Sequence, residues 1–106
     1  MTRPADFRTV VRKGRRVGGP AAILHVLEQP ASDPTRFGFI VTKAVGNAVT
    51  RNVVRRRLRA VSRDILEFVP TGRDVVIRAL PGSDQVPWAT LHAEITAGVD
   101  RGVSRG

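Results

Sequence analysis

The segment KAVGNAVTRNVVRRRLR, residues 43–59, contains a turn, the start of a helix and five arginines within seventeen residues. Gly46-Asn47 marks the turn, and Asn47 is a good helix N-cap because its side-chain oxygen can accept a hydrogen bond from the first helical turn. The segment therefore predicts a long helix over Ala48–Phe68, which Pro70 and Gly72 end. The other elements are predicted to complete an α+β sandwich in which the helices pack against one sheet.

The predicted central helix has two different faces. At about 100° per residue, four apolar side chains fall within one narrow arc and form the expected core stripe: Val54, Leu58, Val61 and Ile65. The opposite face carries four arginines with an asparagine among them: Arg55, Arg56, Arg59, Arg63 and Asn52. Arg51 and Arg57 lie at the two edges of the apolar stripe, where their stems can cover it. One helix is thus expected both to pack on the core and to present guanidinium groups.

The charge distribution points to a polyanionic partner. No acidic residue lies between Asp33 and Asp64, although eight basic residues do, and the whole chain carries a net charge of +9. Like charges on a helix repel each other, whereas alternating charges stabilise it. Sixteen of the eighteen basic residues are arginine, whose planar fork binds phosphate in a bidentate way. Nucleic acid is the favoured partner, although charge runs in general are more often solvated faces and a GC-rich genome would also enrich arginine.

Several classes of protein are disfavoured. The chain has no cysteine, so disulfides, zinc knuckles and thiol chemistry are excluded, and no metal ligands are expected. His25 and His92 have no acid pair near them in the sequence, so we expect no catalytic residue. No apolar run reaches membrane-spanning length and no secretory region is visible. We therefore expect a cytoplasmic chain with no membrane partner.

The remaining segments predict a single domain, residues 1–106, of the α+β class. Helices are expected over Pro4–Lys13 and Pro87–Val103, and strands over Ala21–Glu28, Arg36–Thr42 and Val75–Leu80. A hairpin of the first two strands is the simplest connection. With two or three strands before the central helix, the expected architecture is αβββαβα, a two-layer sandwich with a central sheet.

These residues resemble the bacterial ribonuclease P protein component. The segment Lys43–Asn52, followed by Arg55-Arg56 and Leu58-Arg59, resembles the signature of that family. Asp6-Phe7 with Val10 and Lys13-Gly14 resembles its first helix, and Phe37-Gly38-Phe39 before Val41 resembles the strand that leads into the signature. The resemblance extends from about Pro4 to the last helix.

The resemblance implies both a fold and a role. The fold would contain an unusual left-handed βαβ crossover around the central helix. The role would be that of the protein subunit of ribonuclease P, a ribonucleoprotein endoribonuclease that removes the 5′ leader of precursor tRNA. In such an enzyme the RNA subunit carries the catalysis and holds the Mg²⁺ ions, and the protein binds none tightly. The implied partners are the catalytic RNA and precursor tRNA, with one protein per RNA and no DNA.

The resemblance also assigns residues. Seven positions match the family's RNA-contacting signature: Lys43, Asn47, Arg51, Asn52, Arg55, Arg56 and Arg59. Arg63 extends the same basic face. The cleft between the first helix and the sheet, which would receive the leader, is assigned Phe7, Val11, His25 and Arg12.

The sequence departs from the family pattern at four positions. Val53 stands where relatives often carry arginine, and Arg57 is expected to replace that missing contact in part. Ala44 stands where many relatives carry a second lysine. Val11 and His25 stand where some relatives place aromatics. Stacking of a base on an aromatic ring contributes about 1–3 kcal/mol, so leader binding is expected to depend more on charge here.

Two other classes share some of these features. A structural RNA-binding protein, such as a ribosomal protein, would have the same size and charge, but the spacing of the signature and the cleft residue Phe7 argue against it. A DNA-binding helix-turn-helix protein is less favoured still, because no short helix precedes the basic one. Two candidate residues can also be explained by structure alone. Asn47 can serve only as a helix cap, and His25 can be an ordinary strand residue.

Overall fold

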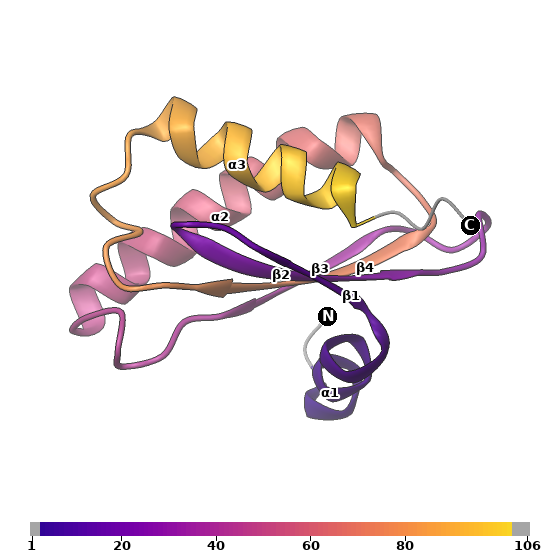
Figure 1. Ribbon diagram of the computed structural model, residues 1–106, viewed down its shortest axis with the longest axis horizontal. Coiled ribbons are helices and arrows are strands. Elements are labelled where there is room, and N and C mark those ends of the chain that lie inside the picture. Colours follow the sequence, from indigo (N-terminus) through magenta and orange to yellow (C-terminus); the bar gives the residue numbers. More distant parts are fainter. Residues whose placement is uncertain (1–2, 103–106) are drawn as a thin grey trace.

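The structure is a computed structural model that describes residues 3–102 (Figure 1). Three helices and four strands follow one another in the predicted order αβββαβα: α1 (Pro4–Lys13), β1 (Arg15–Gly18), β2 (Ala22–Glu28), β3 (Arg36–Ile40), α2 (Ala48–Phe68), β4 (Arg73–Ala79) and α3 (Trp88–Arg101). The predicted bounds of α1 and α2 are confirmed. The last helix begins one residue after its prediction, because Pro87 is its N-cap, and Val103 lies outside the described residues.

The four strands form one sheet in the order β1-β2-β4-β3. β2 pairs with β1 and with β4 in antiparallel fashion, and β3 runs parallel to β4. The predicted hairpin between β2 and β3 is therefore wrong, because β4 lies between them and β2 forms its hairpin with β1. Strands that are apolar on both faces take central positions, and Val75, Val76 and Ile77 of β4 are completely buried. β3, α2 and β4 form a crossover between parallel strands. That this crossover is left-handed remains a prediction from the family resemblance.

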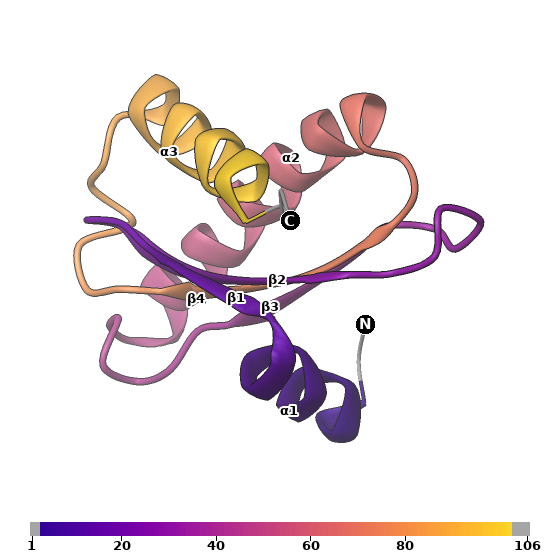
Figure 2. The same ribbon diagram turned by 45° about the vertical axis from the view of Figure 1, so that its right-hand side comes forward.

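Helices cover both faces of the sheet, as Figures 1 and 2 show. α2 and α3 form a layer on one face, which is the predicted two-layer sandwich, and α1 adds a partial third layer on the other. The main core lies beneath α2 and α3 and includes the predicted stripe of α2. α3 packs closely on β2 because Gly98 within it and Gly102 directly after it have no side chain: a Cβ at Gly98 would lie 2.8 Å from Leu24 Cδ2, and one at Gly102 would lie 2.4 Å from Val26 Cγ2.

An ion pair fixes β3 to β4 at one end of the sheet. Asp74 is only 2% exposed and accepts hydrogen bonds from Arg36 Nε at 2.9 Å and Arg36 Nη2 at 2.6 Å. Gln29 Nε2 donates a third bond to this carboxylate at 3.1 Å. The hydrogen bond to Asp74 raises the pKa of the Arg36 guanidinium. This arginine is thus committed to the fold, although it belongs to the long segment without acids.

Candidate RNA interface

The signature begins at a turn that fixes the start of α2. The Asn47 side-chain oxygen accepts a hydrogen bond from the Thr50 amide at 2.9 Å, as predicted for an N-cap. Gly46 has a φ of +153°, and a Cβ there would lie 2.8 Å from Thr50 Cγ2, so only glycine fits. No acidic residue lies in the first turn of α2, so the positive end of the helix dipole is left for an external anion.

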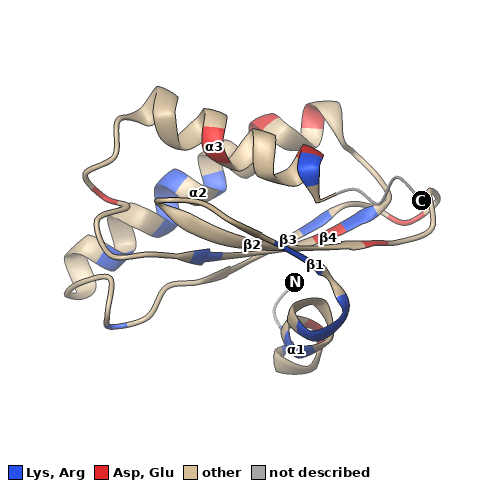
Figure 3. Ribbon diagram, viewed as in Figure 1, with Lys and Arg blue, Asp and Glu red and all other residues tan. Residues whose placement is uncertain are grey.

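The basic face of α2 surrounds a shallow depression of about 490 Å³. Four predicted RNA-contacting residues line it together with an apolar neighbour: Asn52, Arg55, Arg56, Arg59 and Val49. Arg55 Nη1 donates to Asn52 Oδ1 at 3.2 Å, which orients both side chains along the helix. Figure 3 shows the basic residues gathered along this part of α2. We call these five residues the α2 depression.

The other predicted RNA-contacting residues lie around the α2 depression and do not line it. Lys43 and Asn47 are exposed before the first turn of the helix, and Arg63 is exposed farther along it. Arg51 is half-buried at the edge of the core stripe, and its Nε atom is buried without a hydrogen-bond partner among residues 3–102. Val49, which is 72% exposed, was missed in the sequence, although the helix period places it beside Arg56 on the basic face.

Arg57 was expected to replace in part a missing arginine at position 53, but its guanidinium is engaged within the protein. The Arg57 guanidinium donates to the backbone carbonyl oxygens of Ser83, at 2.7 Å, and of Val86. The helix period did place Arg57 beside the apolar stripe, where its stem is half-buried. Its polar end then contacts the connection between β4 and α3 instead of extending toward solvent.

A second candidate surface lies on the opposite face of the sheet. A groove of about 390 Å³ between α1 and β3 is lined almost entirely by apolar atoms and by the stems of two arginines. Its lining residues are Phe7, Arg8, Val11, Arg12 and Ile40, which we call the α1 groove. Three predicted leader-cleft residues are thus brought together. Arg8 and Ile40 were missed, although the spacing of Arg8 and Arg12 by four residues could have indicated the pair.

His25 lies on the same face of the sheet but does not line the α1 groove. Its neighbours Leu24 and Val26 face the main core, so strand alternation directs His25 to the α1 side. The residue is only 9% exposed, and its Nδ1 atom has no hydrogen-bond partner among residues 3–102. Burial, together with the charges of Arg16 and Arg78, lowers the pKa of His25 below its usual 6.5. The imidazole is therefore neutral at pH 7 and adds no charge to this surface.

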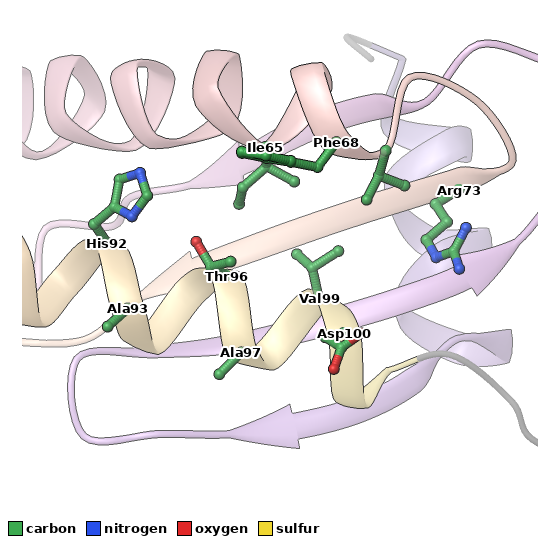
Figure 4. A pocket seen from close by; sticks show the side chains of 10 residues that line it. Ile65, Phe68, Arg73, His92, Ala93, Thr96, Ala97, Val99 and Asp100 are labelled. Atoms are coloured by element: carbon green, nitrogen blue, oxygen red, sulfur yellow. The ribbon is translucent and has the colours of Figure 1, made fainter.

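An apolar hollow of about 440 Å³ separates the end of α2 from α3 (Figure 4). It contains Phe68, which is 79% exposed, and polar groups of Arg73, His92 and Asp100 at its rim. His92 Nε2 lies 3.0 Å from Asp64 Oδ2. None of the predicted RNA-contacting residues lines this hollow, so it is separate from both basic surfaces.

Residues 3–102 contain neither a metal-binding cluster nor a helix that could span a membrane. No group of three or more His, Cys, Asp or Glu side chains there could hold a metal ion. Within the same range, no helix has both the length and the apolar character needed to cross a membrane.

The fold, the basic α2 depression and the α1 groove beside Arg8 and Arg12 define a small α+β protein suited to contact with a polyanion. The sequence model of the ribonuclease P family matches residues 1–102. Two similar relatives are both called ribonuclease P protein component. The one from Clavibacter michiganensis is 52% identical over 103 residues, 97% of this chain and 91% of the relative. The one from Streptomyces avermitilis is 44% identical over 110 residues, 95% of this chain and 89% of the relative.

Solved structures have the same fold. The RNase P protein of Staphylococcus aureus superposes with a TM-score of 0.82 at 21% identity, covering 95% of this chain and 92% of the other. The Thermotoga maritima RNase P protein, solved with 1-(4-fluorophenyl)-2-thiourea, gives 0.83 at 20% identity, with 95% and 97% covered. The chain belongs to the ribonuclease P protein component family. It is therefore a subunit of a tRNA-processing endoribonuclease whose partner is the RNase P RNA.

Proposed function

We propose that the α2 depression binds the RNase P RNA while the α1 groove holds the 5′ leader of precursor tRNA. The protein thereby assists the Mg²⁺-dependent endonucleolytic removal of the leader, which gives the mature 5′ end of the tRNA. The observation that carries this proposal is the grouping of Asn52, Arg55, Arg56 and Arg59 around one depression on a single helix face. No protein residue is assigned a catalytic role, and the chemistry is assigned to the RNA.

The chemistry of the α2 depression suits an RNA backbone. Guanidinium groups donate paired hydrogen bonds to phosphate oxygens, and such contacts position a nucleic acid without reading its sequence. The hydrogen bond between Arg55 and Asn52 restricts both side chains before RNA arrives, which lowers the entropy lost on binding. The first turn of α2 carries no acidic residue, so the positive end of its helix dipole acts in the same direction.

The α1 groove suits a single strand of any sequence. Its apolar floor offers Phe7 as a ring on which one base can stack, and Arg8 and Arg12 follow along the same helix as partners for the phosphates. Every leader has phosphates and base faces, so a groove of this kind accepts leaders that differ in sequence. Since Val11 offers no ring, charge supplies a larger share of the binding.

The surfaces do not suit a protein-bound Mg²⁺ ion. The α2 depression is lined by arginines, which repel cations, and residues 3–102 contain no cluster of carboxylates or histidines that could coordinate one. We assign the Mg²⁺ ions to the RNA. One protein per RNA and a cytoplasmic location, where precursor tRNA is found, complete the proposal.

The test is cleavage of precursor tRNA by a bacterial RNase P RNA at low Mg²⁺ concentration, with and without the protein. The wild type should restore cleavage, and the double variant Arg55→Ala, Arg59→Ala should not. Arg15→Ala, Arg101→Ala is the matched control, because it removes the same charge from exposed positions outside both surfaces. A wild-type protein that binds the RNA without restoring cleavage would indicate a structural RNA-binding protein instead.

A further inference from the structure

Arg57 lies inside the arginine run but is bound to the protein itself. Its two terminal nitrogens donate to two backbone carbonyls of the segment that joins β4 to α3: Nη1 to Ser83 oxygen at 2.7 Å, and Nη2 to Val86 oxygen. Each nitrogen of the planar fork thus has its own acceptor. Charge-assisted hydrogen bonds of this kind are shorter and stronger than neutral ones.

The contacted segment is itself fixed to the core. Ser83 is buried, and Val86 packs against the core cluster. Two turn hydrogen bonds, Ser83 amide to Leu80 oxygen and Gln85 amide to Gly82 oxygen, hold the segment in shape, and Pro87 directly after it is the N-cap of α3. Arg57 therefore joins the basic half of α2 to a well-ordered support.

This link fixes the rotation of α2 about its own axis. The apolar stripe of α2 holds the helix against the core, but apolar contacts have no preferred direction. Hydrogen bonds have a preferred direction, and their donor–acceptor distances vary by only about 0.5 Å. Side chains reach about 6 Å from a helix axis, so a rotation of about 10° would shift a guanidinium by about 1 Å. That shift is larger than the spread of hydrogen-bond lengths, so the Arg57 bonds resist it, and it would also move Arg56 relative to a bound phosphate.

We propose that Arg57 is a positioning residue: it does not contact RNA, and its bonds to Ser83 and Val86 hold the α2 depression at the angle that RNA binding requires. The inference rests on the proposed function of that depression. It separates two adjacent arginines of one run, Arg56 as a phosphate ligand and Arg57 as the residue that orients it.

The test compares substitutions of these two neighbours. Arg57→Met keeps the apolar stem and removes the guanidinium, Arg57→Lys keeps the charge without the fork, and Arg56→Met is the matched control on the exposed face. For each variant, the dissociation constant for RNase P RNA is measured at several KCl concentrations, well below the melting temperature. The slope of log K against log salt counts the phosphates that the protein neutralises.

We expect Arg56→Met to reduce the slope by somewhat less than one unit, the loss of about one phosphate contact. Arg57→Met should leave the slope unchanged while weakening binding by roughly two- to thirty-fold at fixed salt, the range for residues that act through others. Arg57→Lys should behave like Arg57→Met, because one ammonium cannot replace a fork across two carbonyls.

Two results would overturn the inference while the proposed function stands. A slope reduced as much as in Arg56→Met, and restored by Arg57→Lys, would make Arg57 a phosphate ligand. Unchanged RNA binding by a folded Arg57→Met protein with a lowered melting temperature would limit Arg57 to stability. A wild-type chain without affinity for the RNA would instead overturn the proposed function together with the inference.

Discussion

Adding a ring to the α1 groove should tighten binding of the leader. Val11 lines this groove with Phe7, one helical turn away, and is 40% exposed, so Val11→Phe would place its ring at the surface without forcing it into the core. Stacking of one base on an aromatic side chain contributes about 1–3 kcal/mol. Because valine already offers some apolar contact, we expect the lower end, about 1 kcal/mol, or about five-fold in affinity.

The assay is the affinity of the assembled ribonucleoprotein for precursor tRNAs with leaders of increasing length. The gain from Val11→Phe should appear only when the leader is long enough to reach the groove and should be absent for mature tRNA. Ala5→Phe is the matched control, since it adds the same ring to an exposed position of α1 outside the groove. An equal gain for mature tRNA, or for the Ala5→Phe protein, would refute the placement of the leader in the α1 groove.

Three further predictions concern stability. The pKa of His25 is lower in the folded protein than its usual 6.5, so the unfolded chain binds the proton more tightly; the free energy of unfolding should fall as the pH drops below about 6.5. Urea titrations at pH 7.5 and 5.5 should show a smaller difference in His25→Leu. Gly98→Ala should destabilise the fold by about 1–3 kcal/mol through overpacking against Leu24, as measured by urea unfolding. Asp74→Asn should lower the thermal midpoint, since Arg36 and Gln29 lose a buried charged acceptor, at a cost of about 1–3 kcal/mol.

The central helix could be predicted from the sequence because its signals are local. The cap of Asn47, the bounds of α2 and the opposition of its core stripe to its arginines all depend on residues within a few turns of one another. The α1 residues Phe7, Val11 and Arg12 were assigned from the family resemblance instead, and the structure brings them together in one groove.

The order of the strands could not be predicted in this way. Whether β2 pairs with β3 or with β4 depends on contacts between residues about fifty positions apart, and the apolar pattern of each strand fits either neighbour. The short strand β1 has only one residue that is not exposed, so no core pattern marks it. Arg57 illustrates the same limit, because helix periodicity places it beside the core but cannot identify Ser83 and Val86 as its acceptors.

The sheet that separates α1 from α2 also separates the proposed leader surface from the proposed RNA surface. The α1 groove and the α2 depression share no residue, and Figure 2 shows α1 and the later turns of α2 on opposite faces of the sheet. Mutations in one surface can therefore accumulate without altering the other. On the proposed assignment, a lineage could adapt its leader recognition to a new set of tRNA genes while keeping the same RNA subunit, and grafting α1 together with residue 40 from a relative would transfer leader preference.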